Sequence, residues 1–186
     1  MVKIIGISGT NGSGKDTVGQ ILASEGWLFI SGSDILREEL RRRGLPIERE
    51  NLRMVGNEWR REYGLGVLID KAVEEYRKSG NHVGLAIASL RNPGEADRVH
   101  ELGGKVVWVD ADPKIRYQRI YSRGRSTEDS KTYEQFLAEE QAEMHHDGDA
   151  ATLSMAGVKA KADIFIDNNS SDIESFKNEV GKTVRL

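Results

Sequence analysis

Gly9-Thr10-Asn11-Gly12-Ser13-Gly14-Lys15-Asp16-Thr17 is the most informative part of this sequence. It follows an apolar, β-branched run at 2–8 and precedes an amphipathic pattern at 15–25. Glycines let the backbone curl with its N–H groups pointing inward, and a helix N-terminus adds unpaired N–H groups and the positive end of a dipole. This order of strand, glycine loop and helix predicts a cradle for a nucleotide phosphate, with Lys15 reaching the β- and γ-phosphates.

Beyond this loop, short apolar runs alternate with longer amphipathic ones. We expect strands near 2–8, 27–30, 82–90, 105–109 and 164–166. We expect helices near 15–25, 33–43, 48–62, 65–79, 93–102, from 113, and near 130–146, 150–161 and 171–180. Strands that alternate with helices favour a parallel sheet covered on both faces. The prediction is one α/β domain over 1–186, a three-layer P-loop NTPase fold with a five-stranded parallel sheet flanked by helices.

The bulk composition excludes several other classes of protein. The 186 residues carry 27 Lys and Arg against 30 Asp and Glu, which disfavours a nucleic-acid partner. There is no Cys, hence no disulfide framework and no thiolate metal site. No apolar run approaches the roughly 20 residues of a membrane span, and the N-terminus lacks the pattern of a signal peptide. We therefore expect a cytoplasmic protein with no membrane partner, and leave its oligomeric state open.

The phosphate loop departs from the general P-loop pattern at one position. Asp16 stands where that pattern has a Ser or Thr that ligates magnesium, and Thr17 follows it. This form resembles the loop of nucleoside monophosphate kinases, and its Gly-Lys-Asp-Thr version that of deoxynucleoside monophosphate kinases. The resemblance implies ATP and Mg²⁺ as cofactors, with Thr17 on phosphate and the metal held mainly through waters, some of them on Asp16. The implied cofactor-binding positions of the loop are Gly9, Asn11, Gly12, Ser13, Gly14, Lys15, Asp16 and Thr17.

An acid follows the second predicted strand at Asp34, and Arg37 comes one helical turn later. In the kinases that the loop resembles, an acid here faces the acceptor or a magnesium-bound water. Asp34 could equally cap the helix that begins there, and Arg37 could lie on a solvated surface. The resemblance places an acceptor-binding helical segment at about 33–80, and makes both residues candidates for acceptor binding.

Leu90-Arg91-Asn92-Pro93-Gly94 follows the third predicted strand, where open α/β sheets bind ligands. The planar guanidinium of Arg91 suits a phosphate, although it could also be a surface residue at a helix start. The segment resembles the D-x-x-R-N-P-x-E stretch of dephospho-CoA kinase and of the kinase-like domain of some deoxycytidylate deaminases. That resemblance implies that Arg91 binds the acceptor phosphate. The acid of the pattern is missing, with Ser89 in its place, so Asp16 or Asp34 substitutes for it or activity is weaker.

A row of arginines on one helical face follows the fourth predicted strand, at Arg116, Arg119 and Arg123. Guanidinium groups repel one another unless anions meet them. Glu128 and Asp129 could serve as counterions. The row also resembles the lid of nucleotide kinases, here at about 119–131, which implies that Arg119 and Arg123 reach the transferring phosphoryl group.

The stretch 162–170 resembles the last strand and turn of dephospho-CoA kinase, where the turn packs beside the adenine ring. Asn168 and Asn169 are then candidate cofactor contacts through their backbone groups. The alternative is an ordinary Asn-rich turn.

Together these features predict an ATP-dependent kinase that phosphorylates a small phosphorylated acceptor, most simply a nucleoside or deoxynucleoside monophosphate. Dephospho-CoA is the alternative acceptor, and a non-catalytic ATP-binding sensor or regulatory protein is the alternative class. The candidate catalytic residues are Lys15, Asp34, Arg91, Arg119 and Arg123.

Overall fold

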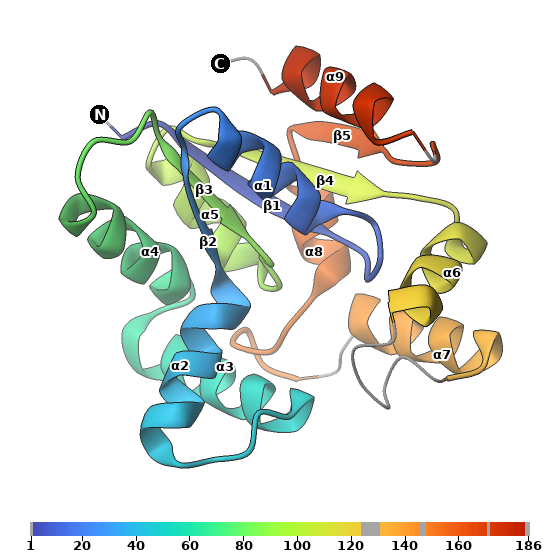
Figure 1. Cartoon of the computed structure of the whole chain (residues 1–186). Coiled ribbons are helices and arrows are strands. Elements are labelled where there is room, and N and C mark those ends of the chain that lie inside the picture. Colours follow the sequence, from blue (N-terminus) through green and yellow to red (C-terminus); the bar gives the residue numbers. More distant parts are fainter. Residues whose placement is uncertain (1, 124–130, 146–147, 171, 185–186) are drawn as a thin grey trace.

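A computed structural model describes residues 2–123, 131–145, 148–170 and 172–184, without the side chain of Arg123. Its centre is a parallel sheet of five strands in the order β2-β3-β1-β4-β5 (Figure 1). The strands are β1 (Ile4–Gly9), β2 (Leu28–Ser31), β3 (Leu85–Ala88), β4 (Lys105–Asp110) and β5 (Ile164–Asp167). Helices cover both faces, so the predicted three-layer α/β fold is confirmed.

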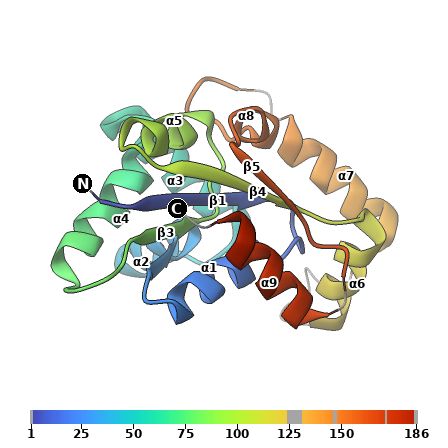
Figure 2. The same ribbon diagram turned by 90° about the horizontal axis from the view of Figure 1, so that it is seen from above.

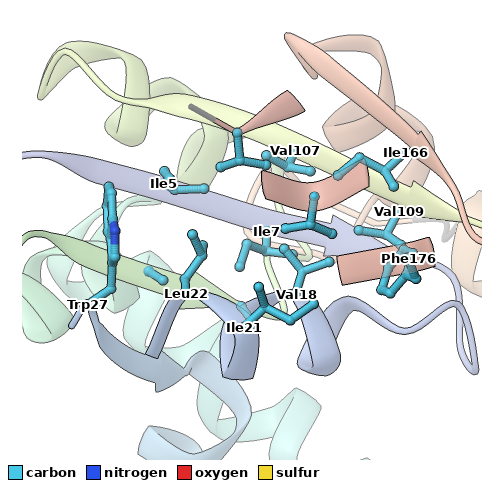
Figure 3. Packing of buried hydrophobic residues seen from close by; sticks show 14 residues of the cluster. Ile5, Ile7, Val18, Ile21, Leu22, Trp27, Val107, Val109, Ile166 and Phe176 are labelled. Atoms are coloured by element: carbon cyan, nitrogen blue, oxygen red, sulfur yellow. The ribbon is translucent and has the colours of Figure 1, made fainter. Parts of the chain in front are cut away.

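One face of the sheet is covered by α1 (Lys15–Ser24) and α9 (Ile173–Thr183) (Figure 2). Strand side chains alternate between the two faces, so Ile5 and Ile7 of β1 point toward these helices. Val18 of α1 and Phe176 of α9 meet them in one buried cluster (Figure 3). This packing fixes the start of α1, and with it the phosphate loop, against the end of β1.

The opposite face is covered by α4 (Val67–Lys78), α5 (Pro93–Glu101) and α8 (Met155–Ala160). Its buried cluster includes Ile4 and Trp108 from the strands and Val99 and Val158 from the helices. The strands are apolar on both faces, as parallel strands between two helical layers must be.

The remaining helices stand at the carboxyl end of the sheet. Helices α2 (Gly32–Arg43) and α3 (Arg49–Tyr63) pack on each other and on α4 through a third apolar cluster around Leu40 and Trp59. Helices α6 (Pro113–Arg123) and α7 (Tyr133–Met144) follow β4 and lie together on the other side (Figure 1). The phosphate loop, which follows the central strand β1, therefore lies at the carboxyl end of the sheet, between the two helix pairs.

The loop between β3 and α5 is bonded to the start of α5 and to the segment that precedes α8. Asn92 caps α5 by accepting from the Gly94 N–H at 2.8 Å, and its side-chain amide donates to the carbonyls of Ala150 and Thr152, each at 2.8 Å. These bonds hold the segment against the loop, and the helix expected at 150–161 begins only at Met155, where Ser154 caps it by accepting the Gly157 N–H.

A buried ion pair joins α3 to this loop. Arg60 and Glu95 are 5% and 1% exposed, and the Arg60 Nη2 lies 2.7 Å from Glu95 Oε1. The other carboxylate oxygen accepts the N–H groups of Arg91 at 2.7 Å and Asn92 at 3.1 Å. Both charges are thereby compensated, and the loop that carries Arg91 is fixed relative to α3.

We predict that Arg60→Met lowers the free energy of unfolding by about 3 kcal/mol, because it leaves a buried carboxylate without its partner. Chemical denaturation with urea measures this loss. Arg61→Met is the matched control. Arg61 pairs with Asp149 at 2.8 Å, but both side chains are more than half exposed, so this change should cost less than about 1 kcal/mol. Equal losses in the two variants would contradict the importance of burial.

Candidate active site

The phosphate loop joins β1 to α1 in a conformation that requires glycine at two closely packed points. Gly14, the residue before α1, has φ 97°, and a Cβ there would collide with the side-chain amide of Asn168. A Cβ at Gly9 would collide with the carbonyl of Val109 on β4. The loop thus lies directly against the ends of β4 and β5 and leads into the N-terminus of α1, a position that favours anions.

Asn168 holds the loop from the end of β5. It is 7% exposed; its side-chain amide donates to the Ser13 carbonyl at 2.8 Å, and its N–H donates to the Asp110 carbonyl at 2.8 Å. Its carbonyl accepts from Arg119 Nη2 at 2.9 Å. Asn169 is exposed and accepts the Asp112 N–H at 2.6 Å. The structure therefore gives the Asn168 side chain a supporting role that its turn sequence did not indicate.

Two buried side-chain atoms lack a hydrogen-bond partner within the described residues, and both belong to predicted cofactor-binding residues: Ser13 Oγ and Arg119 Nη1. Burial also lowers the pKa of the Arg119 guanidinium, because desolvation disfavours its charged form. Buried polar atoms are normally paired, and the oxygens of a bound polyphosphate would pair both. The residues present thus fit a nucleoside triphosphate.

The first turn of α1 carries the other predicted loop residues. Lys15 and Thr17 are half-buried, and Asp16 is exposed. Within the described ranges, no three His, Asp or Glu side chains gather into a metal cage. A magnesium ion fits this loop if it is held by nucleotide oxygens and water, with the few carboxylates beside the loop as outer ligands.

Asp110, at the end of β4, is the acid next to the loop that sequence reasoning did not select. Its Oδ1 accepts from Thr10 Oγ1 at 2.8 Å and from the Ala111 N–H at 2.9 Å, and Arg116 Nε lies 3.5 Å away. Burial raises its pKa, but the hydrogen bonds from Thr10, Ala111 and Trp108 and the charge of Arg116 together bring it below the usual 3.8. The signal was present, since an acid at a strand end beside the phosphate-loop strand is typical of nucleotide sites.

Ser89 occupies the end of β3, where an acid was expected. It has φ 70°, the one left-handed conformation of a non-glycine residue in the described chain. Such strain is tolerated where surrounding structure imposes it, often at functional sites. Ser89 is 9% exposed, and its hydroxyl lies 3.4 Å from that of Ser31 on β2. This contact links the ends of the two neighbouring strands.

The predicted acceptor residues fall into two places. Asp34 and Arg37 lie on α2 and pair with each other at 2.6 Å, with 70% and 40% of their side chains exposed. Arg91, beyond β3, points to α7, where its Nη1 lies 3.2 Å from Glu143 Oε2. Asp34 and Arg37 thus bond to each other, whereas Arg91 bonds across to α7.

The arginines of α6 have different surroundings: Arg116 is bonded to α7, whereas Arg119 lies beside the phosphate loop. Arg116 is 2% exposed and forms a two-pronged ion pair with Glu140 of α7, one prong being 2.8 Å, while its Nε donates to the Ala111 carbonyl at 2.7 Å. Arg119 turns toward the β5–α9 turn beside the phosphate loop. The side chain of Arg123 and residues 124–130, with the candidate counterions and most of the predicted lid, lie outside the described residues.

Fold and phosphate loop together define a P-loop protein of the kinase-like type. An AAA domain family model matches residues 5–145. A UPF0200 protein from Pyrobaculum aerophilum is 32% identical and covers 99% of this chain and 98% of its own. Another from Sulfurisphaera tokodaii is 30% identical over 100% of this chain and 97% of its own. The chain belongs to the UPF0200 proteins and carries this AAA domain.

Solved structures agree with this fold assignment. A shikimate kinase from Bacteroides thetaiotaomicron superposes with a TM-score of 0.60 at 13% identity, covering 98% of this chain and 96% of that one. The protein TT1252 from Thermus thermophilus gives a TM-score of 0.53 at 22% identity, covering 97% and 94%. At these identities the likeness concerns the fold alone. No helix in the described part of the chain has the length and apolar character of a membrane span.

Asp110→Asn should lower the melting temperature at pH 7 by about 2–4 °C, the equivalent of roughly 1 kcal/mol in a chain of this size. The pKa of Asp110 is depressed in the folded state, so its ionised form stabilises the protein above pH 3.8. That stability is lost as the pH falls through the folded-state pKa. The difference between wild type and variant should therefore shrink below about pH 4.

Thermal melts from pH 7 to pH 3 test this expectation. Asp97→Asn is the control, because Asp97 is half exposed and pairs with Lys161 at 2.6 Å. It should change the melting temperature at pH 7 much less. A constant difference between wild type and Asp110→Asn across the range would contradict the assigned ionisation.

Proposed function

We propose that this protein is an ATP-dependent kinase that phosphorylates a small phosphorylated acceptor, most simply a nucleoside or deoxynucleoside monophosphate. The observation that carries the proposal is the pair of unpartnered buried atoms, Ser13 Oγ and Arg119 Nη1, beside an open glycine loop. Both are hydrogen-bonding groups of residues predicted to bind the cofactor. Unpaired buried polar groups are uncommon in folded proteins, and bound phosphate oxygens would supply partners for both.

In this proposal ATP supplies the γ-phosphoryl group. A bond forms between its phosphorus and an oxygen of the acceptor's phosphate, while the bond to the bridging oxygen of ADP breaks. Lys15 and the N–H groups at the start of α1 hold the phosphates and stabilise the charge that develops on them. Arg119 supports the same charge with its unpaired Nη1, because Asn168 and Ser170 fix its other terminal nitrogen through their carbonyls.

The proposed magnesium site uses the acids that flank the loop. In this proposal Asp16, in the first turn of α1, and Asp110, which accepts from Thr10 of the loop, orient metal-bound water. Thr17 faces phosphate, as the resemblance implies. Arg123 and the rest of the segment 119–131 keep their predicted role as a lid.

The proposed acceptor site lies between α2–α4, within 33–80, and the loop after β3. Arg91 binds the acceptor phosphate, and Asp34 and Arg37 contact the remainder of the acceptor. Dephospho-CoA is the alternative acceptor. A panel of common ribo- and deoxyribonucleoside monophosphates with dephospho-CoA, assayed for ADP release with Mg·ATP, distinguishes them.

A second candidate function is an ATP-binding regulatory protein without useful turnover. Ser89 favours it, because no acid stands at the end of β3. No stimulation of ADP release by any acceptor, together with tight ATP binding measured separately, would support this function and contradict the kinase.

We predict that Lys15→Ala lowers the turnover by about 10³-fold or more, since it removes the charge closest to the transferring group. The melting temperature should stay within a few degrees of wild type, because Lys15 is half-buried at a helix start and not part of an apolar cluster. ADP release under saturating ATP and acceptor measures the effect. Lys3→Ala, an exposed lysine before β1, is the control and should keep full activity. Near-normal turnover of Lys15→Ala would contradict the mechanism.

A further inference from the structure

The carboxylate of Glu143, near the end of α7, lies between two guanidinium groups. Arg91 Nη1 is 3.2 Å from its Oε2, and Arg49 Nη1 is 3.6 Å from its Oε1. Arg91 comes from the loop after β3, and Arg49 is the first residue of α3. Two separate segments thus each bring an arginine to one carboxylate, which is carried by a third segment, α7.

This convergence borders the phosphate loop. Thr10 and Asn11 of the loop line the same pocket as Arg49 and Glu143, and the free space between them is about 20 Å³. That volume accommodates about one water molecule. An acceptor phosphate that binds both arginines would therefore compete with the Glu143 carboxylate.

The ion pairs of Glu143 are of the kind that exchange easily. Its side chain is 27% exposed, and those of Arg91 and Arg49 are 34% and 39% exposed. Ion pairs this accessible contribute little to stability. A phosphate monoester carries up to two negative charges and three acceptor oxygens, so it is the stronger ligand for two guanidinium forks.

Helix α7 is held at other points, so Glu143 can leave without detaching the helix. Glu140 forms the buried two-pronged pair with Arg116, and Phe136 is 6% exposed under the Arg116 guanidinium. Glu139 pairs with Lys131 at 2.5 Å, a contact that involves neither proposed subsite arginine. Glu143 lies one residue before the last residue of the helix, beyond these contacts.

We propose that Arg49 and Arg91 form the subsite for the acceptor's phosphate monoester, and that Glu143 occupies this subsite until the acceptor displaces it. The inference rests on the proposed function and adds Arg49 and Glu143 to it. Such a subsite would select phosphorylated acceptors, because a neutral nucleoside has no group that can replace the carboxylate between the two arginines.

The test measures acceptor binding by isothermal titration calorimetry, with saturating Mg·ADP to fill the phosphate loop. The probes are the common ribo- and deoxyribonucleoside 5′-monophosphates, with the matching nucleosides as phosphate-free controls. Glu143→Gln should bind the preferred monophosphate about three- to tenfold more tightly, since it keeps the shape and removes the competing charge. Arg49→Ala should bind it at least about tenfold more weakly.

Glu134→Gln, an exposed glutamate in the first turn of α7, is the matched charge control and should bind like wild type. Tightening by Glu143→Gln alone, for monophosphates and not for nucleosides, would support the subsite. Equal affinities of wild type and Glu143→Gln, equal tightening by Glu134→Gln, or no monophosphate binding by any variant would overturn it.

Turnover assays on the same proteins separate the two proposals. ADP release stimulated by a monophosphate, together with unchanged affinity in Glu143→Gln, would leave the kinase intact and remove the subsite. Tighter monophosphate binding in Glu143→Gln without acceptor-stimulated ADP release would keep the subsite and remove the kinase.

Discussion

The hydrogen bond from the Asn168 side chain to the Ser13 carbonyl ties the two ends of the chain together at the phosphate loop. Because Gly14 adopts a left-handed conformation against that same amide, the loop shape and the position of β5 depend on each other. Asn168 also holds Arg119, through its carbonyl, and the Asp110 carbonyl, through its N–H. The anion-binding groups of the loop are therefore preorganised by one buried amide rather than by the loop alone.

The distribution of charge at the carboxyl edge follows from this arrangement. Arg91 comes from the loop after β3 and Arg116 from α6, and each meets a glutamate of α7. Arg116 is buried and its pair acts as an anchor, whereas the more accessible pair of Arg91 can exchange its anion. Burial thus separates a structural ion pair from one suited to ligand binding, although the residue types are the same.

Most of the fold followed from periodicity. The alternation of short apolar runs and amphipathic segments predicted all five strands of the sheet, because parallel strands buried on both faces are nearly continuous apolar runs. The shortened α8 could not be predicted, since the segment before it is held by Asn92, which bonds to carbonyls of residues far along the chain. In the site, the glycine loop was evident from local spacing. Asp110 and Glu143 act through long-range contacts with Thr10, Arg49 and Arg91, which spacing alone does not reveal.

The strand order has a consequence for how the chain acquires its structure. The central strand β1 pairs with β3 and β4, so Ile4 lies beside Leu85 and Ile5 beside Lys105, and β2 joins only at β3. The first two strands to leave the ribosome have no ladder with each other. Closure of a long loop must precede the first backbone pairing, which raises the entropic barrier and favours slow, topology-limited folding. Until β3 is synthesised, the apolar β1 has no strand to pair with, and exposed apolar strand edges favour aggregation.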